Sequence, residues 1–245
     1  MVKLFRNTRK TLINQGKTAN YLKYAIGEIV LVMIGILLAL QVNNWNEARK
    51  TKLEEKTSLK ELKQDLLDEA SKMKTTQVYT KQGIDYLNKI SKGNYNEVPL
   101  DYFFLMVAQT GDFKSITVDT KYFGLKNNGK LELISNDTLK DKIMEFYESV
   151  HPNLETNIDY HKTYVLQHIE APLVDLLPLN KELLVTDDQA VIDLLKSSNI
   201  MSKVNYQIFY QKRFEGFFEN ILDSINDIVS DIDKELGPTK NKRDD

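Results

Sequence analysis

An apolar run of 18 residues, Ala25 to Val42, constrains this chain more than any other feature. As a helix the run is about 27 Å long at 1.5 Å per residue. The hydrocarbon core of a bilayer is roughly 30 Å thick, so a helix of this length spans it once. The sequence therefore predicts one transmembrane helix, over residues 24–44.

Aromatic residues mark both ends of the predicted span. Tyr21 and Tyr24 lie at one end and Trp45 at the other, where amphipathic rings favour the membrane interfaces. A cleaved signal peptide is one alternative, but Ala39–Leu40–Gln41 is a poor small-residue cleavage site. A buried helix of a soluble core is another, although such a helix rarely follows six unopposed positive charges.

The charge distribution predicts the orientation of the span. Residues 1–23 contain six lysine and arginine side chains and no acid, whereas the rest of the chain has eight more acids than bases. The positive-inside rule keeps such a short basic segment in the cytoplasm. We expect a cytoplasmic segment over 1–23, an inner-membrane helix over 24–44, a periplasmic helical domain over 45–237 and a polar tail over 238–245.

The same charge distribution limits the partners. The basic segment suits the anionic headgroups of the lipid bilayer. The acidic remainder would approach nucleic acid with net repulsion, so we expect no nucleic-acid partner.

Glu28 is the charged residue within the apolar run, about 5 Å from its start. At that depth its side chain can reach the headgroups, so it can be a tolerated edge residue. Gly27, Gly35 and Ala39 share one helix face and would let two helices approach closely. The second reading is therefore that Glu28, next to this face, makes a polar contact between helices of an oligomer. A proton- or ion-carrying role is the third reading.

Two stretches carry a resemblance to a known family. The first is the pattern YAIGEI, IGILLALQ and NNWNE between Tyr24 and Glu47, and the second runs from Thr120 to Tyr147. Together they cover about a fifth of the chain. The pattern resembles the N-terminal signature of a family of single-pass membrane proteins from Bacteroidota with a domain of unknown function. The resemblance implies a membrane anchor followed by a helical periplasmic domain, and it implies no activity.

Residues beyond the span predict an all-α domain. Leucines and other apolar residues recur at helical spacing from Glu47 to Ser91, and the stretch Ser91–Pro99 should end that helix. A short helix should follow around Tyr102 to Met106, and Gly111–Asp119 is the one stretch with strand-like alternation.

Turn and cap signals divide the rest of the chain. Gly129 should end a helix, and Ser135 or Asn136 should cap the next. A further helix is expected over Leu154–Leu177, with Pro172 as a point where it can bend, and Thr186 or Asp187 should cap a short helix after it.

The final helix has the strongest periodicity. Its apolar residues step by four and three, which is heptad spacing. These six residues are Phe214, Phe218, Ile221, Ile225, Ile228 and Ile232. They form either a core stripe or an oligomer contact, and the rings from Tyr206 to Phe218 can alternatively line a ligand pocket. An elongated antiparallel helical bundle, in which this helix packs against the first one, accommodates the pattern.

Candidate chemical groups are sparse. The chain has no cysteine, which excludes thiolate metal sites and cysteine nucleophiles. His161 and His168 are about 10 Å apart along a helix, too far to share a metal, and we interpret them as residues of a polar face. The acids around Asp65 and Glu69 are interpreted as solvated or capping. We therefore predict no catalytic, metal-binding or cofactor-binding residue.

These features favour a non-enzymatic protein that acts in assembly or scaffolding of the cell envelope, with itself or another envelope protein as partner. A periplasmic small-ligand sensor, or an accessory subunit of a membrane complex, is the second hypothesis. An ion-conducting oligomer built around Glu28 is the third, and an enzyme is the last.

Overall fold

The computed structural model describes residues 18–109, 120–196 and 198–238, and the strand-like stretch expected over 111–119 lies outside them. The chain divides into two compact units, Met1–Glu54 and Glu55–Asp245. Among the described residues every element is helical, apart from an isolated antiparallel bridge between Leu179 and Val185. The prediction of an all-α chain is confirmed.

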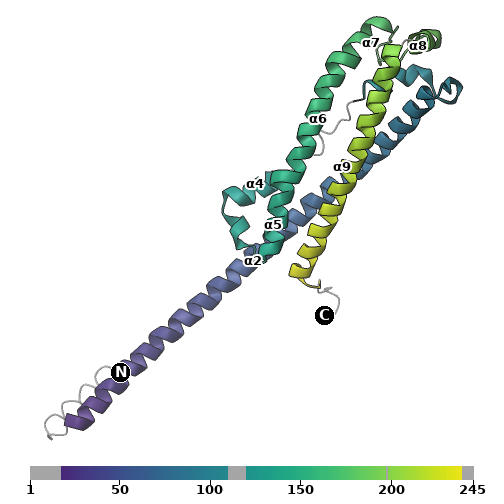
Figure 1. Ribbon diagram of the computed structural model, residues 1–245. Coiled ribbons are helices and arrows are strands. Elements are labelled where there is room, and N and C mark those ends of the chain that lie inside the picture. The colour runs from purple at the N-terminus through teal and green to yellow at the C-terminus, as the bar shows by residue number, and fades with distance from the viewer. Residues whose placement is uncertain (1–17, 110–119, 197, 239–245) are drawn as a thin grey trace. The chain divides into compact units, whose positions relative to one another are not determined.

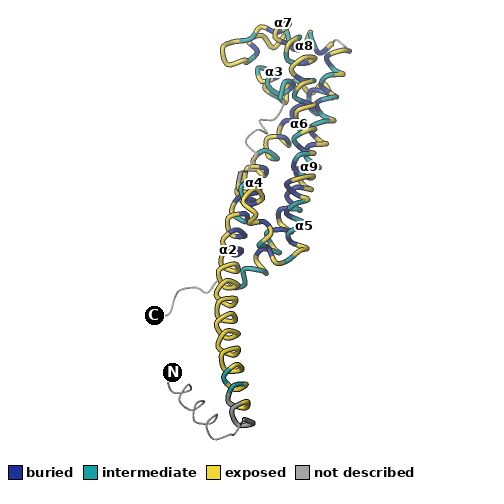
Figure 2. The backbone as a smooth tube through the Cα atoms, turned by 90° about the vertical axis from the view of Figure 1, so that its left-hand side faces the viewer, coloured by how far each residue is buried: buried dark blue, intermediate teal, exposed yellow. Residues whose placement is uncertain are grey.

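The first described helix, α2 (Thr18–Ser91), contains a stretch long and apolar enough to cross a membrane. Its residues 29–54 are all exposed, as Figure 2 shows. The helix ends where expected, because Gly93 adopts a φ of +79°, in the left-handed region that favours glycine.

Short elements follow α2. They are η1 (Tyr95–Glu97), η2 (Leu100–Tyr102), α3 (Phe103–Val107), α4 (Thr120–Asn127) and η4 (Lys130–Leu133). Gly129, with a φ of +69°, ends α4 as predicted. The Asn136 side chain accepts a hydrogen bond from the Leu139 amide and so caps α5 (Asp137–Glu145), which confirms the second of the two caps considered.

The next helical segment begins earlier than expected. α5 continues through the π-helical turn η5 (Phe146–Val150), α6 (His151–Val165), a second π-helical turn η6 (Leu166–Glu170) and α7 (Ala171–Leu176). Pro152 and Pro172 each follow a π turn by two residues. A proline lacks the backbone donor and clashes with the carbonyl of the preceding turn, and a wider π turn accommodates both defects. The expected start at Leu154 was therefore wrong.

Two helices complete the chain. α8 (Asp188–Leu195) is capped by the Asp187 side chain, which accepts from the Gln189 amide. α9 (Ser198–Leu236) ends at Gly237, whose φ is +71°. Figure 1 shows α9 beside the α5–α7 segment and beside the later half of α2.

Side-chain contacts fix the register of the long helices in the second unit. Lys63 Nζ lies 2.7 Å from an Asp233 carboxylate oxygen, and Lys81 Nζ lies 3.3 Å from Glu215. Contacts from successively later α2 residues reach successively earlier α9 residues, so these two helices run antiparallel. Lys142 contacts Asp227 and His161 contacts Gln207, so α9 is antiparallel to α5 and α6 as well.

The buried apolar residues form two clusters. The first joins the middle of α2 to α4, α5 and the last half of α9, and it contains all six residues of the heptad stripe. The second joins the end of α2 to α3, η6, α7, α8 and the first part of α9. The stripe therefore lies in the core of the second unit.

Candidate functional site

Three acidic residues of α2 are buried, and each contacts the segment between α4 and α6. Glu55 accepts hydrogen bonds of 2.7 Å from the backbone amide and the hydroxyl of Ser135. Asp65 lies 2.7 Å from Lys121 Nζ. Glu69, with 0% of its surface exposed, places a carboxylate oxygen 3.1 Å from Nε2 of His151, which is 1% exposed. These polar contacts join the segment to α2 inside an otherwise apolar cluster.

The π turn η5 directly precedes His151. It ends at Val150, so His151 is the first residue of α6, and the His151 ring lies 6.1 Å from the ring of Phe146. Next to Phe146, Tyr147 stacks on Tyr122 at 4.5 Å, and the Tyr122 hydroxyl donates to Glu148. π turns inside helices often accompany functional positions.

A second group of buried polar residues separates the two apolar clusters. We call it the polar layer; it consists of Thr80, Gly83, His161, Gln207 and Gln211. In α2, α6 and α9 alike, the apolar cluster residues lie on either side of these positions. The layer therefore crosses all three long helices at one level.

Hydrogen bonds within the polar layer define the state of His161. The Gln207 amide nitrogen donates to the carbonyl of Val107 at 2.7 Å, so the Gln207 side-chain oxygen faces His161 at 3.1 Å. An amide oxygen only accepts, so His161 Nε2 carries a hydrogen and donates it to Gln207. Burial lowers the pKa of His161 to about 4, and the bond to Gln207 offsets part of that effect.

Two glutamine side chains pack closely against Gly83 where α2 meets the layer. A β-carbon at position 83 would lie 2.7 Å from the side-chain oxygen of Gln109 and 2.8 Å from that of Gln211. Two glutamine side chains thus occupy the space that a side chain at 83 would need.

Aromatic rings continue from the layer along α6 and α9. His161 stacks on Tyr210 at 4.9 Å, and Tyr164 stacks on Tyr206 at 4.1 Å. Burial, followed by the effects of neighbouring tyrosines, raises the pKa of Tyr206. The rings stack face to face and so pack α6 against α9.

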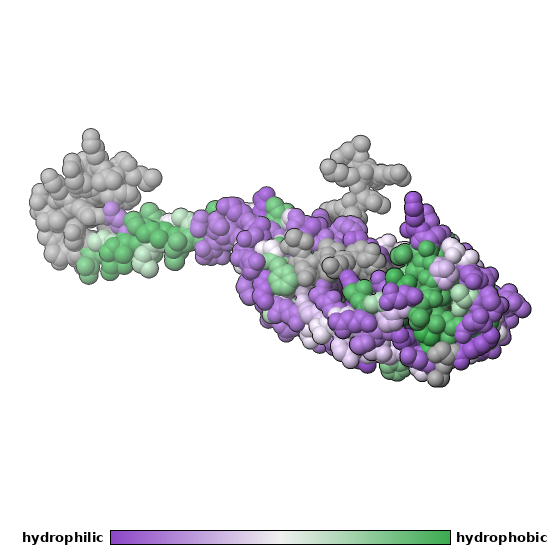
Figure 3. All heavy atoms as spheres, turned by 90° about the horizontal axis from the view of Figure 1, so that it is seen from above, coloured by the Kyte–Doolittle hydropathy of each residue, from purple (hydrophilic) through white to green (hydrophobic). Residues whose placement is uncertain are grey.

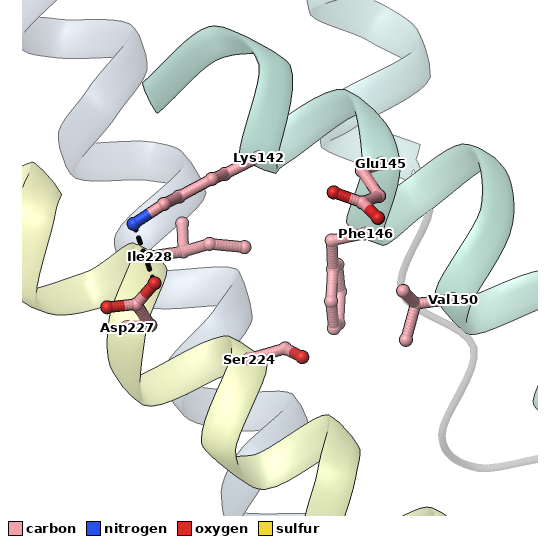
Figure 4. Close-up of a pocket in the computed structure, with 7 residues that line it drawn as sticks. All are labelled: Lys142, Glu145, Phe146, Val150, Ser224, Asp227 and Ile228. Carbon is pink, nitrogen blue, oxygen red and sulfur yellow. Dashed lines mark hydrogen bonds and ion pairs between the residues drawn. The ribbon is translucent and has the colours of Figure 1, made fainter. Parts of the chain in front are cut away.

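A shallow hollow lies between α5 and α9, and Figure 4 shows its lining. Its volume is about 240 Å³, with Phe146 and Ile228 among its apolar residues and Glu145 and Ser224 among its polar ones. Lys142 bonds to Asp227 and to Asp231, both at 2.6 Å, so its charge is already balanced by two carboxylates. Those carboxylates raise the pKa of Lys142, the Asp227 hydrogen bond contributing most.

The residues predicted for the membrane segment lie along one helix. Gly27, Gly35, Ala39 and Trp45 are exposed and Glu28 is half-buried. The side chains of Tyr21 and Tyr24 lie outside the described residues.

Two interpretations of polar residues were wrong. His161 is buried rather than on a polar face, and Asp65 and Glu69 are buried rather than solvated; His168 is exposed, as interpreted. In the described part of the chain, no group of three or more histidine, aspartate or glutamate residues could hold a metal ion.

The sequence contains a signal that would have found the buried acids. Positions 55, 59, 62, 66, 69 and 73 step by four and three, so Glu55 and Glu69 occupy core positions of an otherwise apolar heptad stripe. Gln207 and Gln211 occupy the same kind of position in α9, upstream of Phe214.

Comparison with known proteins places the chain in a family. A family described as a family of unknown function, DUF6090, matches residues 28–165, which is more than half of the 245 residues. The match includes part of the membrane-type stretch, Glu69 and His151, and it ends before α9. No curated protein and no solved structure matches the chain. The chain therefore belongs to the family of unknown function DUF6090.

Proposed function

We propose that this protein is a non-enzymatic, membrane-anchored component of the bacterial cell envelope whose helical domain assembles with another envelope protein or with copies of itself. Residues 24–44 anchor it in the inner membrane, residues 1–23 stay in the cytoplasm, and the elongated antiparallel helical bundle lies in the periplasm. The basic first segment and the following apolar run support this orientation. The resemblance of the N-terminal pattern to Bacteroidota proteins supports the cellular setting.

An exposed leucine at a loop tip carries the proposal of assembly. Leu183 is 44% exposed and has a φ of +60°, a conformation that is costly for a residue with a β-carbon. The Asn180 side chain fixes this loop by accepting from the amides of Glu182 and Leu184. The chain thus holds an apolar side chain in solvent, in a strained backbone, which favours a contact role over a packing role.

Further apolar side chains lie close to this loop in the sequence. Leu176 is 55% exposed and Val174 is also exposed, both on α7. Figure 3 shows hydrophobic residues gathered at the end of the second unit that carries α7 and α8. Large apolar residues grouped on a surface are typical of protein contacts.

Replacing Leu176 and Leu183 together by asparagine tests the proposal. Asparagine tolerates the left-handed conformation at 183, so the fold should persist while the apolar contact is lost. Cross-linking in native membranes, read by mass spectrometry, should show at least a tenfold loss of the cross-linked partner or oligomer. The matched control replaces Val78 and Tyr79, which are equally exposed on α2, by asparagine and should leave the cross-linked species unchanged. Equal yields from both variants would contradict this assignment.

A further inference from the structure

A second hollow, larger than the one between α5 and α9, lies between α2 and the end of α9, within the second unit. Its volume is about 730 Å³. We call it the lysine pocket; it is lined by Lys56, Lys60, Lys63, Gln64, Leu67, Asp233, Leu236, Gly237 and Pro238. The volume exceeds what an inorganic phosphate ion needs, so a ligand that fills the pocket is a larger organic molecule.

The lining is positively charged. Lys56, Lys60 and Lys63 recur at intervals of four and three and so share one face of α2. Lys63 is neutralised by Asp233, with Nζ 2.7 Å from one carboxylate oxygen. Lys56 Nζ donates to the carbonyl oxygen of Leu236 at 3.5 Å. Among the described lining residues, two lysine charges therefore have no acidic side chain that balances them, which favours an anionic ligand.

The C-terminal end of α9 disfavours the binding of an anion, but less strongly than the lysines favour it. The last carbonyl groups of a helix carry about half a negative charge, and they face this pocket at Leu236. One such partial charge does not cancel two lysines. Lysine is a common ligand of phosphate groups, which it contacts as a point charge.

Apolar residues also line the pocket. Leu67, 40% exposed, Leu236 and Pro238 lie beside the lysines. Burial of an exposed leucine side chain under an apolar group of the ligand would contribute favourably to the free energy of binding. We propose that the lysine pocket binds a phosphate ester that also carries an apolar portion. An anionic phospholipid and a soluble organic phosphate are the two sources of this chemistry.

Native mass spectrometry of the full chain in a neutral detergent tests the proposal. The probes are phosphatidylglycerol, phosphatidylcholine with the same acyl chains, and glycerol 3-phosphate. We expect the phosphatidylglycerol adduct to exceed the phosphatidylcholine adduct, and the variant Lys56→Gln/Lys60→Gln to lower it at least tenfold. Lys60→Gln alone should lower it about threefold. The matched control, Lys72→Gln/Lys74→Gln, removes two exposed lysines elsewhere on α2 and should have no effect.

The two sources give different results. A lipid source predicts that phosphatidylglycerol binds more tightly than glycerol 3-phosphate, and a soluble source predicts that glycerol 3-phosphate binds at least as tightly. In either case the pocket variant loses binding and the control keeps it. If the pocket variant retains every adduct while its far-UV circular dichroism matches that of the unmodified chain, the proposal is overturned.

Discussion

Replacing Glu69 by leucine should lower the free energy of unfolding by about 3 kcal/mol, the cost typical of breaking a buried ionisable pair. The reason is the 3.1 Å ion-pair contact with His151, because leucine leaves a buried imidazole without its carboxylate partner. Urea denaturation of the full chain in detergent, followed by far-UV circular dichroism, measures the change. The double variant Glu69→Leu/His151→Leu should recover more than 1 kcal/mol of the loss, because an apolar pair of similar volume needs no hydrogen bond.

The matched control for this pair is Glu155. Its carboxylate lies 3.9 Å from the other ring nitrogen of His151 and its side chain is 39% exposed. Glu155→Gln should change the stability by less than about 0.5 kcal/mol, as is usual for exposed pairs. If the double variant loses as much stability as Glu69→Leu and His151→Leu lose together, Glu69 and His151 do not stabilise each other.

Acidification should destabilise the second unit through His161. The folded chain keeps His161 neutral down to a pKa of about 4, whereas an unfolded histidine titrates near 6.5. Between these values the unfolded state binds more protons, so stability falls as the pH falls through this window. From pH 7 to pH 5 the expected contribution is a loss of about 2 kcal/mol.

The variant His161→Gln isolates this contribution. Its loss of stability between pH 7 and pH 5 should be about 2 kcal/mol smaller than that of the unmodified chain, because glutamine does not titrate. A pH dependence that is identical in the His161→Gln variant and in the unmodified chain would be inconsistent with a buried neutral His161.

Local signals in the sequence predicted much of the helical layout. Gly93 and Gly129 end helices because their backbone angles suit glycine, and Asn136 and Asp187 cap helices with their side chains. Each of these signals acts within a few residues, so it can be read without knowledge of the tertiary structure.

The run through Pro152 could not be predicted in the same way. Proline normally indicates a helix boundary, and here a π turn absorbs it. Whether the helix ends at the proline or continues through a π turn depends on which residues pack around the turn. Phe146 and Tyr147 of that turn are buried against α2 and α9, which favours the continuous helix.

The buried polar residues were missed for a different reason. Acids are mostly exposed in proteins and histidines are buried less often than apolar residues, so residue type alone suggested a solvated face for Glu69 and His161. Their place in the heptad register is the better guide, because a residue on the core face of a helix is buried whatever its polarity. Buried polar residues at such positions fix the register of packed helices at some cost in stability.

We propose that a membrane helix anchors this chain with its helical domain outside the cytoplasm. The chain contains no cysteine, so single-cysteine variants report topology cleanly. Thr11→Cys lies in the basic segment, and Ser71→Cys is at an exposed position of α2. With a membrane-impermeant maleimide on intact spheroplasts, Ser71→Cys should be labelled, and Thr11→Cys should be labelled only after lysis. Labelling of Thr11→Cys but not Ser71→Cys in intact spheroplasts, or recovery of the protein in the soluble fraction, would contradict this membrane topology.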